Sequence, residues 1–249
     1  MAVRSSKKIP WRAVFFSILT LLVLYAGISV LDLFNENQIL HQQLIIQQNN
    51  QATQGGSSDA QTSLTQNFKR GDVPLPVTSD HRRGSSSASL VLIEYADYDC
   101  PFCQAFFPTV QALRSHYGDQ LAWVYRQYPL DIHPHAQLKA EIAECVANQD
   151  GEEAFWKATD HMFTHIAEAD QAAVLAGLAR EGIMTNGIAG CIQNNQVVAK
   201  IAQSKLDIGT EIHGTPGVYI IKNDGSGISF AGALPISTYE KVIDTLLNN

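Results

Sequence analysis

The stretch that most constrains the fold of this chain spans residues 90–117, LVLIEYADYDCPFCQAFFPTVQALRSHY. Its first part, Leu90–Ala96, is a short run of aliphatic and aromatic residues, which predicts a buried strand. From Pro101 onward apolar residues recur at the three-to-four spacing of one helical face. The residues of this face are Phe102, Phe106, Val110, Leu113 and Tyr117. Cys100 therefore lies at the junction between a strand and a helix.

The junction carries the motif Cys100-Pro101-Phe102-Cys103. The first turn of a helix leaves backbone N–H groups unpaired and carries partial positive charge, which favours a thiolate on Cys100. Pro101 fits the first helical position, where no N–H is needed. Cys103 follows one turn later on the same side, so the two sulfurs can form a disulfide that an outside thiol opens. A metal-ligand pair or a purely structural bridge is the alternative, but a closed zinc site needs a second nearby pair.

The length of 249 residues and the 45% share of hydrophobic residues allow one domain with an insertion, or two small domains. The net charge is −7, and residues 4, 7, 8 and 12 carry the only charges before position 13. Without those four positive charges the remainder has −7 − 4 = −11, which argues against nucleic acid as a partner. Four cysteines are compatible with two disulfides in an oxidising compartment.

Residues 13–31 contain no charge over 19 positions, and as a helix they would span about 28 Å, enough to cross a bilayer. Basic residues precede this segment and Asp32 and Glu36 follow it, which predicts a cytoplasmic N-terminus and an exported remainder. A cleaved signal peptide is the alternative, although its apolar core is usually shorter and Leu24 fits poorly two residues before Ala26. Both interpretations export the rest of the chain. We expect a single-pass anchor in the inner, cytoplasmic membrane.

The chain divides into three parts: a basic tip with the anchor at residues 1–31, a polar Gln/Asn-rich stalk or linker at 32–70, and a globular part at 71–249. After the first helix we expect a strand at 121–128, a helical region, and then two strands and a helix. The expected helices of that region are 134–148, 152–165, 171–181 and 188–208, and the last three elements are 218–222, 228–231 and 237–247. This order predicts an α/β thioredoxin fold with an all-helical subdomain inserted at about 131–208.

On these motifs, residues 73–247 closely resemble the DsbA-like thioredoxin-fold thiol:disulfide oxidoreductases of bacterial cell envelopes. The resemblance implies an enzyme in which Cys100 is the exposed nucleophile and Cys103 the buried resolving thiol. It also implies that Thr215-Pro216 is a cis-proline pair that offers backbone to an extended substrate segment, next to Pro101 and Phe102. A trans turn proline is the alternative for Pro216, since only X-Pro bonds adopt the cis form cheaply.

Family members carry a buried acid at the position of Glu94, six residues before Cys100. A carboxylate in an apolar setting has a raised pKa and can return a proton, so the resemblance implies that Glu94 helps to deprotonate Cys103. The alternative is that Glu94 pairs with Arg126 on the next strand. The resemblance also implies a structural disulfide between Cys145 and Cys191, worth about 4 kcal/mol in the chain-entropy model. Two unpaired buried thiols are the alternative there.

The sequence departs from the strongly oxidising members of the family at Phe102, where they have His. A His at that position stabilises a thiolate and Phe does not, which leaves the direction of the redox reaction open. Asp97 and Asp99 would also disfavour a thiolate on Cys100 unless solvent screens them.

We therefore expect a membrane-anchored thiol:disulfide oxidoreductase that acts on exported proteins with cysteines, with the oxidising direction favoured and a reductase or isomerase as alternatives. The resemblance implies a quinone-linked membrane redox partner of the DsbB or VKOR type, with no bound cofactor and no metal. A rival hypothesis is a non-catalytic envelope chaperone, or a module that holds Cu(I) between Cys100 and Cys103. Only three methionines occur in the chain, which weakens the copper hypothesis.

Overall fold

The computed structural model describes residues 65–68, 75–208 and 214–248. The predicted anchor at 13–31 and most of the predicted linker at 32–70 lie outside these residues. All of the described residues belong to one compact unit, Ser58–Asn249. Within that described part, no helix is both long enough and apolar enough to cross a membrane.

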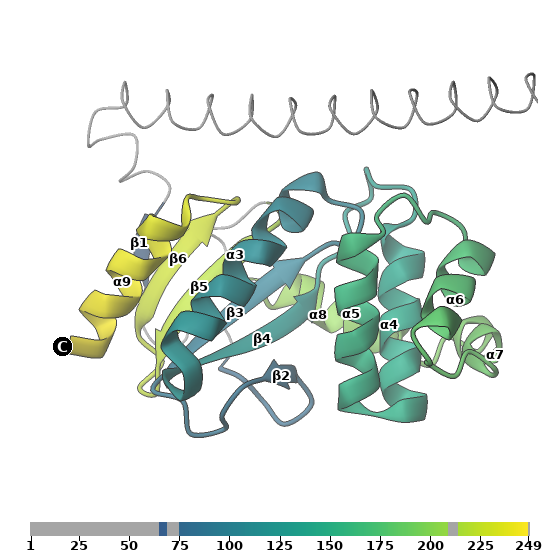
Figure 1. Ribbon diagram of the computed structural model, residues 1–249, viewed down its shortest axis with the longest axis horizontal. Coiled ribbons are helices and arrows are strands. Elements are labelled where there is room, and N and C mark those ends of the chain that lie inside the picture. The colour runs from purple at the N-terminus through teal and green to yellow at the C-terminus, as the bar shows by residue number, and fades with distance from the viewer. Residues whose placement is uncertain (1–64, 69–74, 209–213, 249) are drawn as a thin grey trace, which may run out of the picture. The chain divides into compact units, whose positions relative to one another are not determined.

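The centre of the fold is a six-stranded mixed sheet with the strand order β1-β6-β5-β3-β4-β2 (Figure 1). The strands are β1 Thr65–Phe68, β2 His81–Arg83, β3 Leu90–Ala96, β4 Leu121–Gln127, β5 Gly217–Lys222 and β6 Gly227–Ala231. Strands β3 and β4 are parallel, and all other neighbouring pairs are antiparallel. All residues of β3 and β4 are buried, as expected of central strands that are covered on both faces.

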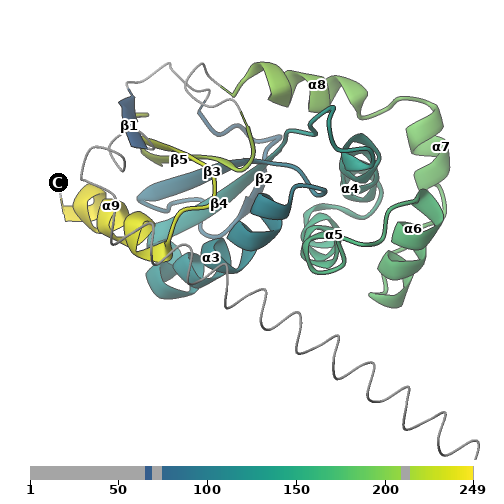
Figure 2. The same ribbon diagram turned by 90° about the horizontal axis from the view of Figure 1, so that it is seen from above.

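Helices cover the sheet and extend beyond it. Helices α3, Pro101–Tyr117, and α9, Ile236–Asn248, lie on one face of the sheet, while α8, Val198–Leu206, lies on the other (Figure 2). Between β4 and β5 the chain also forms α4 Ala136–Asp150, α5 Glu152–Thr164, α6 Gln171–Arg180 and α7 Ile188–Gln193. The prediction of a thioredoxin-like α/β fold with helices inserted between its two halves is confirmed for the described residues.

The apolar core has two parts because side chains alternate between the faces of a strand. The larger part packs α3 and α9, together with α4 to α6, against one face of the sheet. It includes Leu92 and Ala96 of β3 and Phe106 of α3. The smaller part lies on the other face and contains Val91, Ile93, Tyr95, Val124, Ile208, Tyr219 and Ile221.

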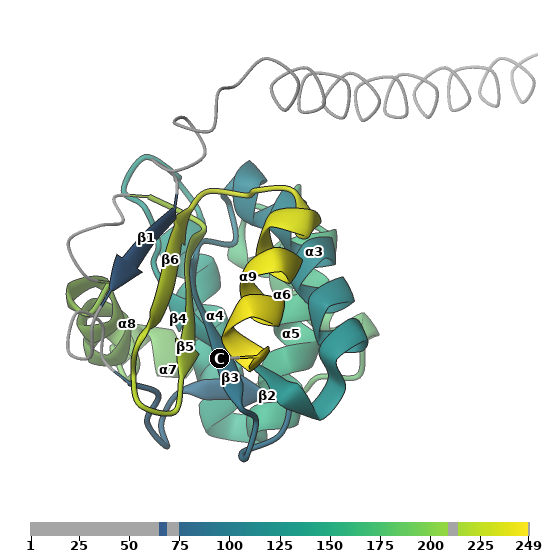
Figure 3. The same ribbon diagram turned by 90° about the vertical axis from the view of Figure 1, so that its left-hand side faces the viewer.

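Most predicted elements agree with the structure to within one or two residues, but the helix expected at 188–208 is wrong. It is two helices, α7 and α8, separated by a turn in which Asn195 has φ 52°. Asn tolerates this left-handed conformation better than most residues. Strand β2 was not expected, and β1 lies inside the predicted linker, where it pairs with β6 at the edge of the sheet (Figure 3).

Phe102, counted with the apolar face of this helix in the sequence, is not part of the buried face of α3, since it is 62% exposed. Cys103 occupies that face instead, in line with Phe106, Val110 and Leu113. The intervals from 103 to 106 to 110 follow the helical period, whereas Phe102 lies one position earlier and points away from the sheet.

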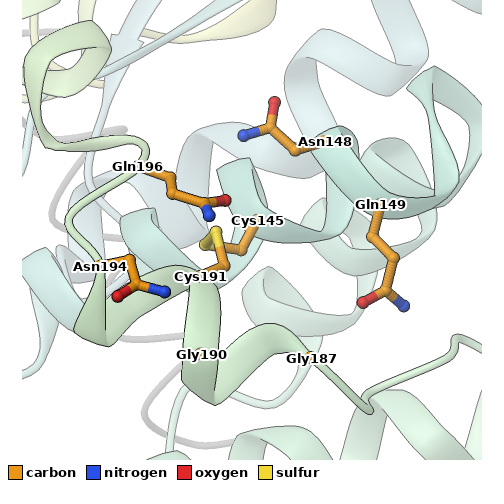
Figure 4. Close-up of a pocket in the computed structure, with 8 residues that line it drawn as sticks. All are labelled: Cys145, Asn148, Gln149, Gly187, Gly190, Cys191, Asn194 and Gln196. Atoms are coloured by element: carbon orange, nitrogen blue, oxygen red, sulfur yellow. A yellow bond between two sulfur atoms is a disulfide. The ribbon is translucent and has the colours of Figure 1, made fainter.

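The inserted helices are joined by a disulfide between Cys145 of α4 and Cys191 of α7, with a Cα–Cα distance of 6.0 Å. It closes a loop of 46 residues, for which the chain-entropy model gives about 4 kcal/mol of stabilisation. Beside the two sulfurs lies a pocket of about 360 Å³ (Figure 4). Its lining contains no charged side chain; the polar residues are Asn148, Gln149, Asn194 and Gln196.

Candidate active site

Cys100 is the residue that caps the N-terminus of α3. Its backbone is extended, with φ −75° and ψ 119°, and Pro101 begins the helix. The turn is closed by a hydrogen bond of 3.1 Å from Cys100 N to Asp97 O, and Gln104 N donates to Cys100 O at 3.1 Å. This geometry directs the unpaired backbone N–H groups of Phe102 and Cys103 at the Cys100 sulfur. Cys100 and Cys103 are both free thiols in this structure.

The surroundings make the two thiols unequal. A hydrogen bond from the Cys103 thiol is the largest cause that lowers the pKa of Cys100 to about 6, and burial opposes it. The Thr215 side chain and the N–H groups of the helix lower the pKa of Cys100 further. Burial raises the pKa of Cys103 well above its ordinary value, and the hydrogen bond with Cys100 adds to that. At neutral pH the pair therefore holds a thiolate at Cys100 and a thiol at Cys103.

Thr215 lies against the Cys100 sulfur although 115 positions separate the two in sequence. The Cys100 Sγ–H donates to the Thr215 carbonyl oxygen at 3.4 Å, and the Thr215-Pro216 peptide bond is cis. The hydroxyl of Thr215 is buried and has no hydrogen-bond partner in this dithiol state. When Cys100 loses its proton, this hydroxyl can donate to the sulfur, because a thiolate accepts hydrogen bonds but has none to donate.

The expectation that Cys100 is exposed is wrong, because only 2% of its surface is accessible. The sulfur lies against the Thr215 carbonyl group at the N-terminus of α3. Phe102 and Pro101, the next two residues of the chain, are exposed. The surface beside the sulfur is therefore accessible, whereas Cys100 itself is nearly covered in this dithiol state.

Glu94 lies in the centre of β3 with 1% of its surface accessible, and neither carboxylate oxygen has a hydrogen-bond partner. Burial raises the pKa of Glu94 to about 8, and the negative charge of Cys100 contributes in the same direction. The Trp123 side chain lowers this pKa in part, although its Nε1 makes no hydrogen bond of ordinary geometry. The charge of Glu94 in turn raises the pKa of Cys103, so the carboxyl group and the buried thiol compete for protons.

The alternative that Glu94 pairs with Arg126 is excluded. The guanidinium of Arg126 binds Asp80, with 2.8 Å from Nη2 to Oδ2, and donates to the Tyr95 hydroxyl at 2.7 Å. Tyr95 follows Glu94 in β3, so its side chain points to the opposite face of the sheet.

The carboxylates of Asp97 and Asp99 bind residues that follow β4 in the chain and are little exposed to solvent. Asp97 lies 2.7 Å from Nδ1 of His133 and accepts a hydrogen bond from Leu130 N at 2.9 Å. Asp99 lies 2.6 Å from Nζ of Lys139. Neither partner was identified from the sequence, because each contact joins residues far apart in the chain.

Cys145 and Cys191 are bonded to each other, so the four cysteines do not form one cluster. Among the described residues, no group of three or more His, Cys, Asp and Glu side chains is placed to hold a metal ion.

The fold is shared with solved structures of thiol-disulfide exchange proteins. A variant of alpha-DsbA1 from Wolbachia pipientis superposes with a TM-score of 0.59 over 72% of this chain and 96% of that chain, at 21% identity. A thioredoxin-like oxidoreductase from Silicibacter pomeroyi gives a TM-score of 0.58 over 70% of this chain and 95% of that chain, also at 21% identity. Both likenesses show a shared thioredoxin-like fold, in which Cys100 and Cys103 of this chain lie as a pair of free thiols.

The family model described as Thioredoxin matches residues 77–245, and the chain belongs to this family. The predicted membership of a thioredoxin-fold family is therefore confirmed.

Curated relatives include a Na⁺/H⁺ antiporter NhaA 1 of Mycolicibacterium gilvum, 40% identical over 93 residues, which are 37% of this chain. Another is NhaA 3 of Salinispora tropica, 32% identical over 151 residues, or 59% of this chain. The matched parts make up only 15% and 22% of these two relatives.

Replacing the buried hydroxyl at position 215 tests how the thiolate is stabilised. Thr215→Val keeps the shape of the side chain and the carbonyl contact but removes the hydroxyl, so the pKa of Cys100 should rise from about 6. The ultraviolet absorbance of the thiolate, followed against pH, gives this pKa. Thr215→Ser is the matched control and should titrate like the unaltered protein. Equal midpoints for Val and Ser would show that the hydroxyl does not stabilise the thiolate.

The buried carboxyl group predicts a pH dependence of stability. The pKa of Glu94 is raised from 4.5 to about 8 in the folded state, so the folded protein keeps a proton that the unfolded chain releases. Its contribution to stability is complete below pH 4.5 and is lost as the pH rises through 8. Glu94→Gln does not titrate, so its free energy of unfolding relative to the unaltered protein should improve by up to about 1.4 kcal/mol per pH unit in this window.

Urea unfolding of the protein with Cys100 and Cys103 reduced, at several pH values, measures this difference. Glu153→Gln, at a side chain that is 85% exposed, is the control and should show no such trend. A stability difference between Glu94→Gln and the unaltered protein that stays constant with pH would contradict the assignment.

Proposed function

We propose that this protein is a membrane-anchored thiol:disulfide oxidoreductase that introduces disulfides into exported proteins through Cys100 and Cys103. The observation that carries the proposal is the inequality of the two sulfurs: one at a helix N-terminus with its pKa lowered to about 6, the other fully buried with its pKa raised. Such a pair differs from a structural bridge such as Cys145–Cys191, because one sulfur is a good leaving group and the other holds its proton at neutral pH.

The oxidising reaction begins with the Cys100–Cys103 disulfide. A substrate thiolate attacks Cys100 Sγ, a substrate–Cys100 disulfide forms, and Cys103 leaves as a thiolate and takes up a proton. A second substrate thiolate then attacks the substrate sulfur of the mixed disulfide. The substrate disulfide forms, Cys100 leaves as a thiolate, and two electrons remain on the dithiol pair.

In this proposal Glu94 supplies the proton in the first step. Its pKa of about 8 means that it is largely protonated at neutral pH, and its charge affects Cys103 directly. As Cys103 becomes a thiolate, the protonated carboxyl group can give up its proton to the sulfur, and it takes the proton back when Cys103 is oxidised again. Neither carboxylate oxygen has a hydrogen-bond partner in this state, so the group is not held by another residue and is free for this transfer.

The stabilised thiolate favours the oxidising direction. A thiolate that is stable in the reduced protein lowers the free energy of the reduced form, which makes the disulfide form a stronger oxidant. Phe102 contributes no side-chain hydrogen bond to the sulfur, so this stabilisation comes from Cys103, Thr215 and the helix N-terminus. A reductase or isomerase, the second candidate, would need the thiolate to be less favoured than this geometry indicates.

The proposed location is supported by the sequence of residues 13–31, and the proposed partners come from the family resemblance. The uncharged stretch at 13–31 would hold the enzyme in the inner membrane, with the N-terminus in the cytoplasm and the catalytic part outside. Similarity to segments of two longer antiporter chains supports a role for this domain at a membrane. A quinone-linked membrane protein of the DsbB or VKOR type would accept the two electrons, and the substrates would be exported proteins with free cysteines.

The test is the oxidation of a reduced, unfolded protein substrate by the full-length enzyme in its disulfide form. Cys100→Ser should abolish substrate oxidation, because it removes the sulfur that is attacked. In reduced Cys103→Ser, Cys100 can still attack the disulfide of an oxidised substrate. The substrate–Cys100 disulfide should then accumulate, because the thiol that would resolve it is missing.

The paired variant Cys145→Ala/Cys191→Ala is the matched cysteine control, because it removes two sulfurs outside the proposed site. It should keep substrate oxidation at temperatures where it remains folded. If Cys100→Ser oxidises substrate as fast as the unaltered enzyme, the proposed function is wrong.

A further inference from the structure

Cys100 is preceded directly by a carboxylate, Asp99, whose charge opposes a thiolate on the next residue. The structure nevertheless lowers the pKa of Cys100. The hydrogen bonds that lower this pKa come from Cys103, Thr215 and the helix N-terminus and do not act on Asp99. The carboxylate next to the reactive cysteine instead has a cation from the inserted helices.

That charge is Lys139 on α4, a lysine with only 1% of its surface accessible. Its Nζ lies 2.6 Å from Oδ1 of Asp99 and donates to the carbonyl oxygen of Ile166 at 2.9 Å. The other carboxylate oxygen of Asp99 accepts a hydrogen bond from His135 N at 2.9 Å. Both oxygens of Asp99 are thus occupied by donors from the insertion.

Burial gives this ion pair its strength. An exposed pair contributes little, whereas in a poorly hydrated site the removal of one partner leaves the other charge uncompensated. The pair between Lys157 and Glu153 on α5 is the contrasting case, with side chains 56% and 85% exposed. The side chains of Lys139 and Asp99 are only 1% and 10% exposed.

We propose that Lys139 is a positioning residue for Cys100: its buried ammonium neutralises Asp99, so that the sulfur one residue later carries negative charge without an anionic neighbour. The inference rests on the proposed function, because it assigns Lys139 a role in the reactivity of Cys100. Lys139 acts through Asp99 and touches no reacting atom in the described contacts.

The other charged groups around the sulfur do not take this role. Asp97 is paired with His133 in the loop after β4, at 2.7 Å. Glu94 and Cys103 are both buried, and burial keeps them largely protonated at neutral pH by raising their pKa values.

The experiment measures the rate at which iodoacetamide alkylates Cys100 in the reduced full-length protein, as a function of pH. The midpoint of this pH profile reports the pKa of Cys100. Lys139→Met leaves the charge of Asp99 uncompensated, so the midpoint should rise by about one pH unit. Asp99→Asn leaves the ammonium without its carboxylate, so the midpoint should move in the opposite direction. The double variant Asp99→Asn/Lys139→Met removes both charges and should return close to the unaltered midpoint, and Lys139→Arg should also keep it.

Lys157→Met is the matched control for removal of a lysine from an ion pair, and its midpoint should not move. If Lys139 has only a structural role, the alkylation midpoints of Lys139→Met and Asp99→Asn should move in the same direction or not move at all. Either result would overturn the proposal. If Lys139→Met does not fold, the double variant must still titrate at higher pH than Asp99→Asn.

Failure of this inference differs from failure of the proposed function. Suppose that Cys100→Ser loses substrate oxidation but the alkylation midpoint of Cys100 is the same in Lys139→Met as in the unaltered protein. The proposed function would then stand, and only the positioning role of Lys139 would be wrong.

Discussion

The chemistry of this protein depends on the interaction between its two neighbouring thiols at the first turn of α3, where the Cys103 thiol is the largest cause that lowers the pKa of Cys100. It operates because β3 delivers Cys100 to the helix N-terminus and because Cys103 lies fully buried one turn later. The same burial that raises the pKa of Cys103 keeps its proton available to stabilise the Cys100 thiolate. Cys103 is therefore the hydrogen-bond donor and Cys100 the acceptor, and the rest of the fold maintains the difference between their pKa values.

Segments distant in sequence complete this arrangement. Thr215 brings a buried hydroxyl and a carbonyl to the sulfur from the turn before β5. The insertion between β4 and β5 holds the two acidic residues before the motif, Asp97 through His133 and Asp99 through Lys139. Under the proposal above, the helical insertion also serves the reactive site, since the ammonium of Lys139 offsets the charge that Asp99 would otherwise place beside a thiolate. The Cys145–Cys191 disulfide fixes α7 to α4, the helix that carries Lys139.

The sequence is sufficient to predict structure where a local hydrophobic pattern and a short motif occur together. The strand–motif–helix unit at 90–117 was predicted with its bounds, because an apolar run, a Cys-x-x-Cys and a helical face follow one another without a gap. Strand β2, His-Arg-Arg, carries no apolar signal; its His81 and Arg83 are held by Glu144, Glu152 and Asp160 on the inserted helices. The buried partner of Asp99, on a helix of the insertion, could not be predicted either, since pairing of that kind is set by tertiary packing. Burial of Cys100 was missed for the same reason, because Thr215 covers it from a distant turn.

The equilibrium of the Cys100/Cys103 pair with glutathione, measured between pH 5 and pH 9, tests the stabilised thiolate most directly. With a pKa of about 6 at Cys100, reduction by two glutathione thiols releases one net proton above that pH, since Cys100 becomes a thiolate and Cys103 a thiol. The equilibrium constant for reduction of the protein should then be flat below pH 6 and rise about tenfold per pH unit above it. A constant that stays flat up to about pH 8 would mean that Cys100 has an ordinary thiol pKa, and would contradict the account.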